Sequence, residues 1–293
     1  MVKKNIFRVI AINATSKSKR TLDIARHCQE VLTSKGIQVL FTKNFEKFTN
    51  KSPLKVSSDK IIINKADLLL SIGGDGTMLS SARNFGSQGL PILGVNLGKL
   101  GFLSDIPPEE ISQGLADILS GQYEEDDRIF LRASINEERD TKIALNEIVI
   151  HSGTVAQLIE YELFIDQKYV YRQKADGIIF ATPTGSTAYS LSGGGPIVHP
   201  CVRSVIITPM FPHSLSSGTL IIEENSSIEV KILASKGKVK LSLDSHNTYS
   251  LNKGDTIKIS KNSSTFRLIH PTNHDFYEGY RNKLGWSTSL ISK

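Results

Sequence analysis

A mainly apolar run that ends in a glycine-rich turn most constrains how this chain can fold. Residues 66–72 form the run, and Gly73-Gly74-Asp75-Gly76-Thr77 follow it directly. A continuous apolar run of this length is typical of a strand buried on both faces of a parallel sheet. The sequence therefore predicts a buried strand, a tight turn and then a helix from about Thr77 to Phe85.

The rest of the first 126 residues alternates strand-like and helix-like patterns in the same way. We expect strands at 6–12, 37–41 and 91–95, a helix before Gly36, and a helix from Pro107 to Leu119. The last of these begins with prolines and ends just before a glycine, as helices often do. Residues 1–126 are thus predicted to form an α/β domain with a largely parallel sheet.

The pattern changes near the acidic stretch 124–127. From there to residue 270 the apolar runs are short, rich in valine, isoleucine and tyrosine, and separated by turns. We expect a β-rich, sandwich-like domain over 127–270. Residues 271–293 carry aromatic side chains at helical spacing, which predicts a terminal helix that returns to pack on the first domain.

Composition narrows the class of function. A chain of 293 residues can bury two cores, and its net charge of +6 is scattered, which favours small anionic ligands over nucleic acid. No apolar stretch suits a membrane span. Cys28 and Cys201 are far apart, so we expect neither a disulfide nor a zinc site, and a cytoplasmic location. His270 and His274 are interpreted as structural, and no metal site made by the protein is expected.

The turn Gly73–Thr77 has the features of a phosphate site. Glycines let the backbone approach a ligand closely, and the first turn of a helix offers free N–H groups to phosphate oxygens. A carboxylate at Asp75 can then accept a proton from an attacking hydroxyl or hold a metal ion. The alternative is an ordinary strand-to-helix turn in which Asp75 caps the helix.

Two further clusters of polar residues stand next to apolar runs. Asp176-Gly177 and the segment 182–196, rich in serine, threonine and glycine, surround the buried run 178–181, and Tyr189 adds an aromatic ring. Such groups suit a nucleotide; the alternative is a flexible linker. Asn146 and Glu147 interrupt an apolar strand over 144–150, so at least one side chain should point inward. A position at the end of the strand is the alternative.

Together these motifs, in this order, resemble the bacterial NAD kinase family. Pro209–His213 and Leu284-Gly285-Trp286 resemble the family as well, and the likeness covers about residues 60–286. It implies a nucleotide site between an α/β domain and a β-rich domain. It also implies transfer of the γ-phosphoryl group of ATP to the 2'-hydroxyl of the adenosine ribose of NAD, giving NADP and ADP, with Asp75 as the catalytic base.

The resemblance also implies the site residues. NAD would contact Asp75, Gly76, Asn146, Glu147, Lys174, Asp176, Thr187, Ala188, Tyr189, Ser190, Leu191, Ser192 and His246. The phosphates of ATP would contact Gly73, Gly74, Gly76 and Thr77. Mg²⁺ or another divalent ion would arrive with ATP, no tightly bound organic cofactor is expected, and the family resemblance favours a homodimer or homotetramer.

Three positions depart from the family pattern. His246 stands where glutamine or asparagine is expected, Gly193 stands in place of alanine, and the segment 216–219 lacks the usual arginine. The motif at Gly73–Thr77 also occurs in diacylglycerol kinases and, in similar form, in phosphofructokinases. A lipid or sugar kinase therefore remains an alternative, as does a non-catalytic sensor of NAD or NADP. The donor is ATP or inorganic polyphosphate, and acceptance of NADH is open.

Overall fold

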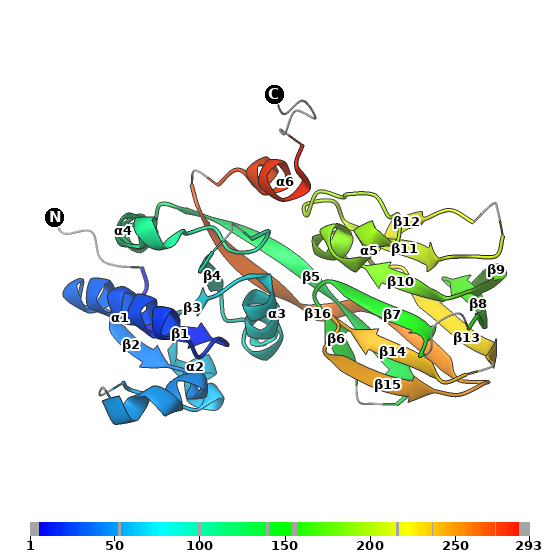
Figure 1. Ribbon diagram of the computed structural model, residues 1–293, viewed down its shortest axis with the longest axis horizontal. Helices are drawn as coiled ribbons and strands as arrows, with labels where there is room; N and C mark the ends of the chain where they lie inside the picture. The colour runs from blue at the N-terminus through cyan, green and yellow to red at the C-terminus, as the bar shows by residue number, and fades with distance from the viewer. Residues whose placement is uncertain are drawn as a thin grey trace. The chain divides into compact units, whose positions relative to one another are not determined.

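The computed structural model divides the chain into two compact units. The first contains Met1–Asp127 and Phe266–Lys293, and the second contains Arg128–Thr265. The structure describes residues 6–286 except 52–53, 99–100, 139–140, 154–156, 215–216, 236 and 273, and it describes no side chains at 47 and 49–51. Figure 1 traces the chain through both units.

The first unit is an α/β fold. Its parallel strands run in the order β2-β1-β3-β4, and β4 also pairs in parallel with Leu268 and Ile269 of β16. Its elements are β1 (Val9–Ala14), α1 (Lys19–Ser34), β2 (Gln38–Phe41), η1 (Lys43–Lys51), α2 (Asp59–Lys65), β3 (Leu68–Ile72), α3 (Asp75–Asn84), η2 (Gly86–Gln88), β4 (Ile92–Val95), η3 (Pro108–Glu110), α4 (Ile111–Leu119) and α6 (Phe276–Leu284). Two strands, β5 (Tyr123–Ile135) and β16 (Thr256–Pro271), begin in one unit and end in the other.

Strand β3 explains why the first unit is layered in this way. All five of its residues are buried, and it pairs with β1 on one side and β4 on the other. Helix α1 covers part of the sheet with a stripe at helical spacing, of which Leu22, Cys28 and Leu32 are buried. Both faces of β3 thus exclude water. The strand ends at Ile72, and the turn that follows leads out of the sheet into α3.

The second unit is almost entirely antiparallel. One sheet has the order β12-β11-β10-β7-β14-β15, and the other strands pair in the order β16-β13-β8-β9, with β5 next to β6. Its further elements are β6 (Lys142–Ala144), β7 (Glu147–Ser152), β8 (Ile159–Ile165), β9 (Lys168–Ala175), β10 (Gly177–Ala181), η4 (Thr184–Thr187), α5 (Tyr189–Ser192), β11 (Ser204–Met210), β12 (Leu220–Glu223), β13 (Ile228–Ser235), β14 (Val239–Leu243) and β15 (Asn247–Leu251).

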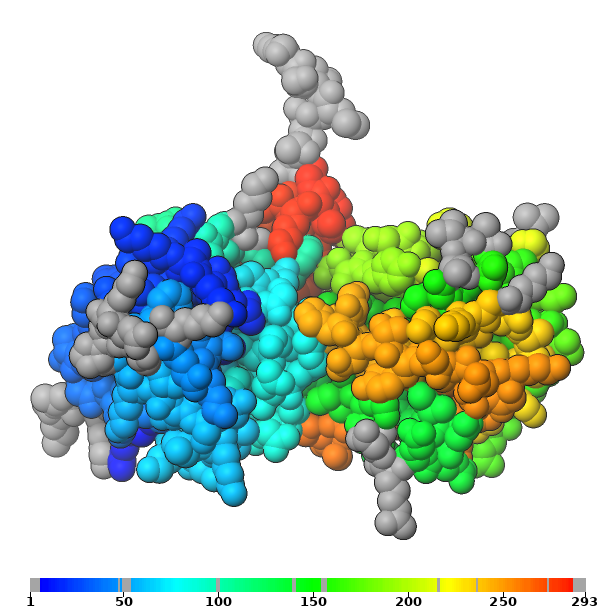
Figure 2. Space-filling model, turned by 60° about the horizontal axis from the view of Figure 1, so that its bottom comes forward, coloured from blue at the N-terminus to red at the C-terminus, as the bar shows by residue number. Residues whose placement is uncertain are grey.

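Two sequence features account for these strands: apolar and polar side chains alternate along them, and the turns between them contain residues that tolerate positive φ. In β14 every second side chain is buried, as expected when one face meets a core. The β8–β9 turn has Asp166 and Gln167 at φ of 49° and 64°, which suits a tight hairpin. The β14–β15 hairpin, orange in Figure 2, lies on the surface of this unit. The predicted β-rich fold is confirmed.

Helix α6 packs within the first unit, and the predicted terminal helix is confirmed. Its amino end is capped by Asp275, whose carboxylate accepts the N–H of Tyr277 at 2.9 Å, and its carboxyl end is followed by Gly285 at φ of 68°. Tyr280 is 2% exposed, and its ring lies 5.5 Å from that of Phe102. Tyr280 and Gly279 therefore lie on the packing face of the helix, whereas Tyr277 is 56% exposed.

Several boundaries differ from the sequence-based expectations. The first strand begins three residues later than predicted, α3 begins two residues earlier, and the helix predicted over 107–119 is a 3-10 turn followed by α4. Helix α2 was not predicted, because Ile61, Ile62 and Ile63 in a row favour a strand. In α2 only Ile62 is buried, while Ile61 is 43% exposed. None of the helices in the described part of the chain is long and apolar enough to span a membrane.

A buried polar network ties β1, β3 and α3 together at the end that leads to the glycine-rich turn. Asn13 donates from Nδ2 to Oγ of Ser81 at 2.8 Å and accepts from Oγ1 of Thr42 at 2.8 Å. The hydroxyls of Ser71 and Ser81 lie 2.8 Å apart. Each group buried here is satisfied by another, so loss of one member removes a hydrogen bond from each of its partners.

We predict that Asn13→Ala lowers the free energy of unfolding of the first unit by about 2 kcal/mol, since Thr42 and Ser81, both buried, each lose a hydrogen bond. Urea unfolding followed by circular dichroism measures the change. The matched control is Asn84→Ala, because Asn84 is exposed and makes one 3.5 Å hydrogen bond. Equal stabilities of the two variants would contradict the role assigned to Asn13.

Candidate functional site

The turn from Gly73 to Thr77 is held tightly by its surroundings. A Cβ atom at Gly73 would lie 2.3 Å from Oγ1 of Thr77, so a side chain has no room there. The N–H of Gly73 donates to the carbonyl of Val95 at 2.9 Å, and the hydroxyl of Thr77 lies 2.7 Å from that of Thr15. The backbone between β3 and α3 is therefore fixed from both sides.

Helix α3 presents an uncapped amino end. Gly74 is its N-cap residue and makes no side-chain cap hydrogen bond, while Asp75 and Gly76 form the first turn. The first N–H groups of a helix have no partner within the helix, and they carry partial positive charge. Such an end binds phosphate oxygens readily. The four residues predicted to contact phosphates thus meet at one helix terminus.

The carboxylate of Asp75 does not cap its own helix. It accepts from the backbone N–H groups of Phe102, at 3.0 Å, and Leu103, at 3.1 Å, and from Nζ of Lys283, at 2.6 Å. The N-cap alternative for Asp75 is therefore wrong. Lys283 belongs to α6 and lies 4.3 Å from the centre of the Phe102 ring. Two segments distant in sequence thus fix one carboxylate.

Sequence reasoning missed these three partners of Asp75. The sequence carries one signal for two of them, which is the glycine at position 101 directly before Phe102 and Leu103. A Cβ at Gly101 would lie 2.4 Å from Oδ1 of Asp75 and 2.6 Å from Oγ of Ser104. The chain can approach Asp75 only where no side chain intervenes, so a glycine is required at this position.

In the second unit, Asn146 and Glu147 lie beside the serine- and threonine-rich segment. The N–H of Thr182 donates to the carbonyl of Asn146 at 2.9 Å, and its hydroxyl donates to the carbonyl of Leu145 at 2.6 Å. A Cβ at Gly185 would lie 2.1 Å from the carbonyl oxygen of Asn146. The close approach of these backbones places the start of β7 against η4.

Asp244 organises the same region and was not predicted to do so. Its carboxylate accepts the N–H groups of three consecutive residues, Leu145 at 3.0 Å, Asn146 at 2.8 Å and Glu147 at 3.2 Å. Asp244 itself sits in a turn with φ of 44°. The only hint in the sequence was its place two residues before His246, whose Nδ1 lies 2.7 Å from the Asp244 carbonyl oxygen.

Glu147 is the buried member of its pair. It is 3% exposed, and its Oε2 has no hydrogen-bond partner among the described residues. Burial, and then the nearby charge of Asp244, raise the pKa of Glu147 from 4.5 to about 7, and the N–H of Tyr189 partly offsets this. A carboxyl group so placed is ready to accept a hydrogen bond from a ligand hydroxyl.

The other predicted residues of the second unit differ in their burial. Thr187, Ala188 and Leu191 are half-buried next to the exposed Tyr189 and Ser192, within or beside η4 and α5. Ser190 is buried, and its hydroxyl lies 3.3 Å from that of Thr208.

Tyr189 and Ser192 line a pocket of about 360 Å³ together with Phe211 and Gly218. Gly193, which departs from the family pattern, also lines this pocket; a Cβ there would lie 3.1 Å from Ile179. Of the segment 216–219, Ser216 is outside the described residues.

Lys174, Asp176 and His246 are less closely tied to that cluster. Nζ of Lys174 lies 3.9 Å from Glu160, and both residues line a second pocket of about 660 Å³, which shares Gly218 with the first. The N–H of Asp176 donates to the carbonyl of Met210 at 3.0 Å, and His246 is exposed in the β14–β15 hairpin. Their contact with NAD stays a prediction.

Comparison with known proteins identifies the family. The model of the ATP-NAD kinase N-terminal domain matches residues 8–123, and that of the C-terminal domain matches residues 145–271. The chain belongs to the ATP-NAD kinase family. It is an enzyme that transfers a phosphoryl group from ATP to NAD, as the family resemblance predicted.

Relatives agree with this assignment over nearly the whole chain. NAD kinases of Pseudomonas putida and Pseudomonas fluorescens are both 40% identical to it, over 98% and 97% of each chain respectively. The crystal structure of yeast NADH kinase with NADH has a TM-score of 0.88 and 30% identity, and covers 98% of this chain and 90% of its own. An Archaeoglobus fulgidus NAD kinase with ATP has a TM-score of 0.69 and 25% identity, over 95% and 97%. The fold class is confirmed.

If Asp75 takes part in the reaction, as the family resemblance implies, we predict that Gly101→Ala lowers kcat by about 100-fold, because a displacement of about 1 Å in a reacting group has an effect of that size. The added Cβ would displace the Asp75 carboxylate rather than backbone atoms, so the unit should still fold. Gly98→Ala is the matched control, since its Cβ would have no atom of the described residues within 4 Å. Steady-state kinetics that do not distinguish the two variants would contradict this role of Gly101.

We predict that Glu147 makes stability depend on pH. Its folded-state pKa, about 7, lies above the ordinary 4.5, so the folded chain holds the proton longer. The free energy of unfolding should therefore fall as pH rises from about 5 to 8, by up to about 3 kcal/mol. In Glu147→Gln this part of the profile should be flat.

Urea unfolding of both proteins across this pH range provides the difference. Exposed Glu138→Gln is the control and should keep the wild-type profile. If wild type and Glu147→Gln lose stability in parallel, Glu147 does not carry the pH dependence.

Proposed function

We propose that Asp75 is the base of the phosphoryl transfer. Its carboxylate takes the proton of the 2'-hydroxyl of the adenosine ribose of NAD while that oxygen attacks the γ-phosphorus of ATP. A new oxygen–phosphorus bond forms, and the bond between the γ-phosphorus and the bridging oxygen breaks. The products are NADP, ADP and a proton held by Asp75.

The observation that carries this proposal is the fixed carboxylate at an uncapped helix end. Asp75 is oriented by two backbone N–H groups and by Lys283, and it stands in the first turn of α3. Phosphoryl transfer depends on positioning and charge stabilisation more than on covalent chemistry. The N–H groups at Gly74–Thr77 and the ammonium of Lys283 supply positive charge where phosphoryl oxygens become more negative.

We further propose that NAD is held by the predicted residues of the second unit. Glu147 offers a buried acceptor without a partner among the described residues, which suits a ribose hydroxyl. The ring of Tyr189 is 43% exposed, which leaves a face for stacking on a purine or nicotinamide ring. Asn146 adds an amide beside them. This set explains how a motif shared by several kinases acts on a dinucleotide here.

ATP and NAD are the substrates in this proposal, and two relatives support it. The Archaeoglobus structure contains ATP, and the yeast structure contains NADH. We propose that Mg²⁺ enters bound to ATP, since carboxylate and phosphate oxygens are the donors that it prefers. Asp75 has the right chemistry to contribute one such oxygen. A cytoplasmic location and a homodimer or homotetramer complete the proposal.

We predict that Asp75→Asn lowers kcat by about 10²- to 10⁴-fold, because asparagine cannot accept the proton. The amide oxygen still accepts the N–H groups of Phe102 and Leu103, so the affinity for NAD should change by less than about threefold, a small free energy. Coupled detection of NADP gives kcat, and calorimetric titration with NAD gives the affinity.

Asp67→Asn is the matched control. Asp67 precedes β3 in the same unit, and its carboxylate accepts the N–H groups of Arg8 and Val9 at 2.7 and 2.9 Å. It therefore makes the same kind of contact without a catalytic role, and its variant should keep its kcat. Near-normal turnover of Asp75→Asn would remove Asp75 as the base.

A further inference from the structure

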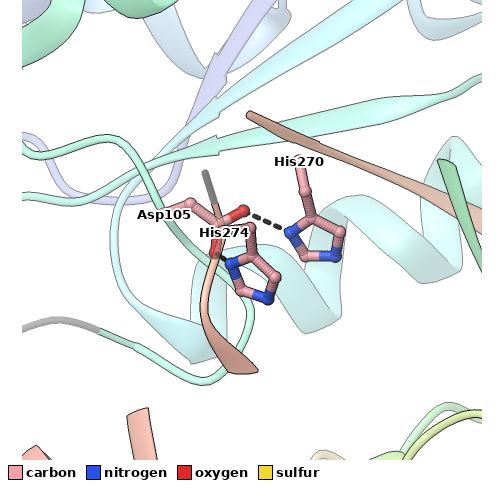
Figure 3. A group of neighbouring side chains, drawn as sticks. All are labelled: Asp105, His270 and His274. Atoms are coloured by element: carbon pink, nitrogen blue, oxygen red, sulfur yellow. Dashed lines mark hydrogen bonds and ion pairs between the residues drawn. The ribbon is translucent and has the colours of Figure 1, made fainter. Parts of the chain in front are cut away.

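Three side chains from distant parts of the first unit meet in one cluster. Asp105 follows the segment that holds Asp75, His270 lies near the end of β16, and His274 precedes α6. Figure 3 shows the Asp105 carboxylate facing the Nδ1 atoms of both imidazole rings. Oδ2 lies 2.5 Å from Nδ1 of His270, and Oδ1 lies 3.2 Å from Nδ1 of His274.

The cluster is both compact and largely buried. One ligand atom from each residue lies within 4.8 Å of the others, and the two rings stack with centroids 4.0 Å apart. The side chains of His270 and Asp105 are 3% and 9% exposed, while that of His274 is 21% exposed. One ring thus faces the interior and the other borders solvent. Because exposure increases from His270 to His274, a small ion can reach the cluster from solvent without disruption of the core.

The donor set selects the kind of ion. Two imidazole nitrogens with one carboxylate oxygen are typical ligands of Zn²⁺ and similar transition metals, whereas Mg²⁺ and Ca²⁺ prefer oxygen atoms. Tetrahedral ligands about 2.0 Å from zinc lie about 3.3 Å apart. Nδ1 of His274 lies at about that distance from Oδ1 of Asp105, whereas Nδ1 of His270 contacts the other oxygen, Oδ2. The three ligand atoms lie within 4.8 Å of one another, so shifts of up to about 1.5 Å bring them to one ion.

The second ring nitrogen of His270 faces a carboxylate at ion-pair distance, longer than a hydrogen bond. This nitrogen, Nε2, lies 3.7 Å from Oδ2 of Asp126. A histidine that binds metal through one ring nitrogen usually directs the other toward a carboxylate or carbonyl, which fixes the tautomer and the ring. In the tautomer protonated at Nε2, His270 would present the lone pair of Nδ1 to the ion.

A pocket provides access and attracts cations. It has a volume of about 330 Å³ and is lined by Asp105 and His274. No described lysine or arginine lines it. Four more carboxylates do, namely those of Glu110, Asp117, Asp275 and Glu278. A concave surface with one sign of charge raises the local concentration of the opposite ion. The open side of the cluster therefore faces a region that favours divalent cations.

We propose that Asp105, His270 and His274 form a binding site for one Zn²⁺ ion, with water from the pocket in the fourth position. The ion links the segment that carries Phe102 and Leu103 to the residues that lead into α6. These are the two parts of the chain that hold Asp75. The site is separate in its ligands from the Mg²⁺ that accompanies ATP, and its role is structural.

The test is direct titration of the full-length protein with Zn²⁺ after treatment with a chelator and desalting. Competition with a chromophoric chelator should give one ion per chain, and millimolar Mg²⁺ should not displace it. His274→Asn should weaken binding by at least about 100-fold, because loss of a direct ligand should cost no less than loss of a residue that only orients one, which costs about 10- to 100-fold. Because His274 is partly exposed and asparagine can still donate to Asp105, this variant should fold.

His27→Asn is the matched control. His27 lies on the same unit, is exposed, and has Nε2 3.2 Å from the hydroxyl of Ser112. This variant should bind Zn²⁺ as wild type does. Thermal unfolding gives a second measurement: saturating Zn²⁺ should raise the Tm of wild type and His27→Asn, and leave that of His274→Asn unchanged.

Co²⁺ gives a third measurement, because its visible absorption depends on the donor set. Wild type should show the bands of a tetrahedral site with nitrogen ligands, and His274→Asn should lose them. Absence of stoichiometric binding, or equal binding by wild type and His274→Asn, would overturn the site. None of these measurements involves turnover, so they do not depend on the role of Asp75.

Discussion

Two consecutive backbone N–H groups hold the carboxylate of Asp75. This contact depends on how several parts of the first unit pack. The contact requires the backbone at Gly101 to pass beside the carboxylate without a side chain. It also requires α6 to pack on Phe102, so that Lys283 reaches the second carboxylate oxygen. A charged side chain between a sheet and a helix terminus would otherwise have several rotamers. Here it has one set of partners, so the carboxylate proposed as the base is oriented before any substrate binds.

In the second unit, too, consecutive backbone N–H groups bind a carboxylate, but there the contact fixes the start of a strand. The carboxylate of Asp244 accepts three consecutive N–H groups at the start of β7, and this fixes the strand from which Glu147 points inward. The negative charge of Asp244 also contributes to the raised pKa of Glu147. One aspartate thus both positions a carboxyl group and changes its ionisation. In each unit an acidic residue is anchored by consecutive backbone N–H groups; Asp244 accepts three of them, whereas Asp75 accepts two and is also paired with Lys283.

The sequence predicted those parts of the fold that depend on local pattern. Buried strands such as β3 and the amphipathic stripe of α1 follow from apolar spacing, and α6 follows from aromatic residues three and four apart. Helix α2 was missed because its isoleucines satisfy a strand pattern, and only tertiary packing shows that just one of them is buried. At the candidate site, Asp75 and Glu147 were found from their residue types. Their partners Phe102, Lys283 and Asp244 were not, because pairing over such distances in sequence leaves no periodic signal.

The division of the first unit into two stretches has a consequence for folding. Lys283 and Asp75 are 208 positions apart, and the whole of the second unit lies between them in sequence. The entropy of closing so long a loop must be overcome before this contact adds stability, unless the intervening residues have already become compact. We therefore expect the β-rich unit to fold first and shorten the effective loop. On this view, the ability to transfer a phosphoryl group appears late in folding, and it reports on the folding of a unit that does not contain Asp75, the proposed base.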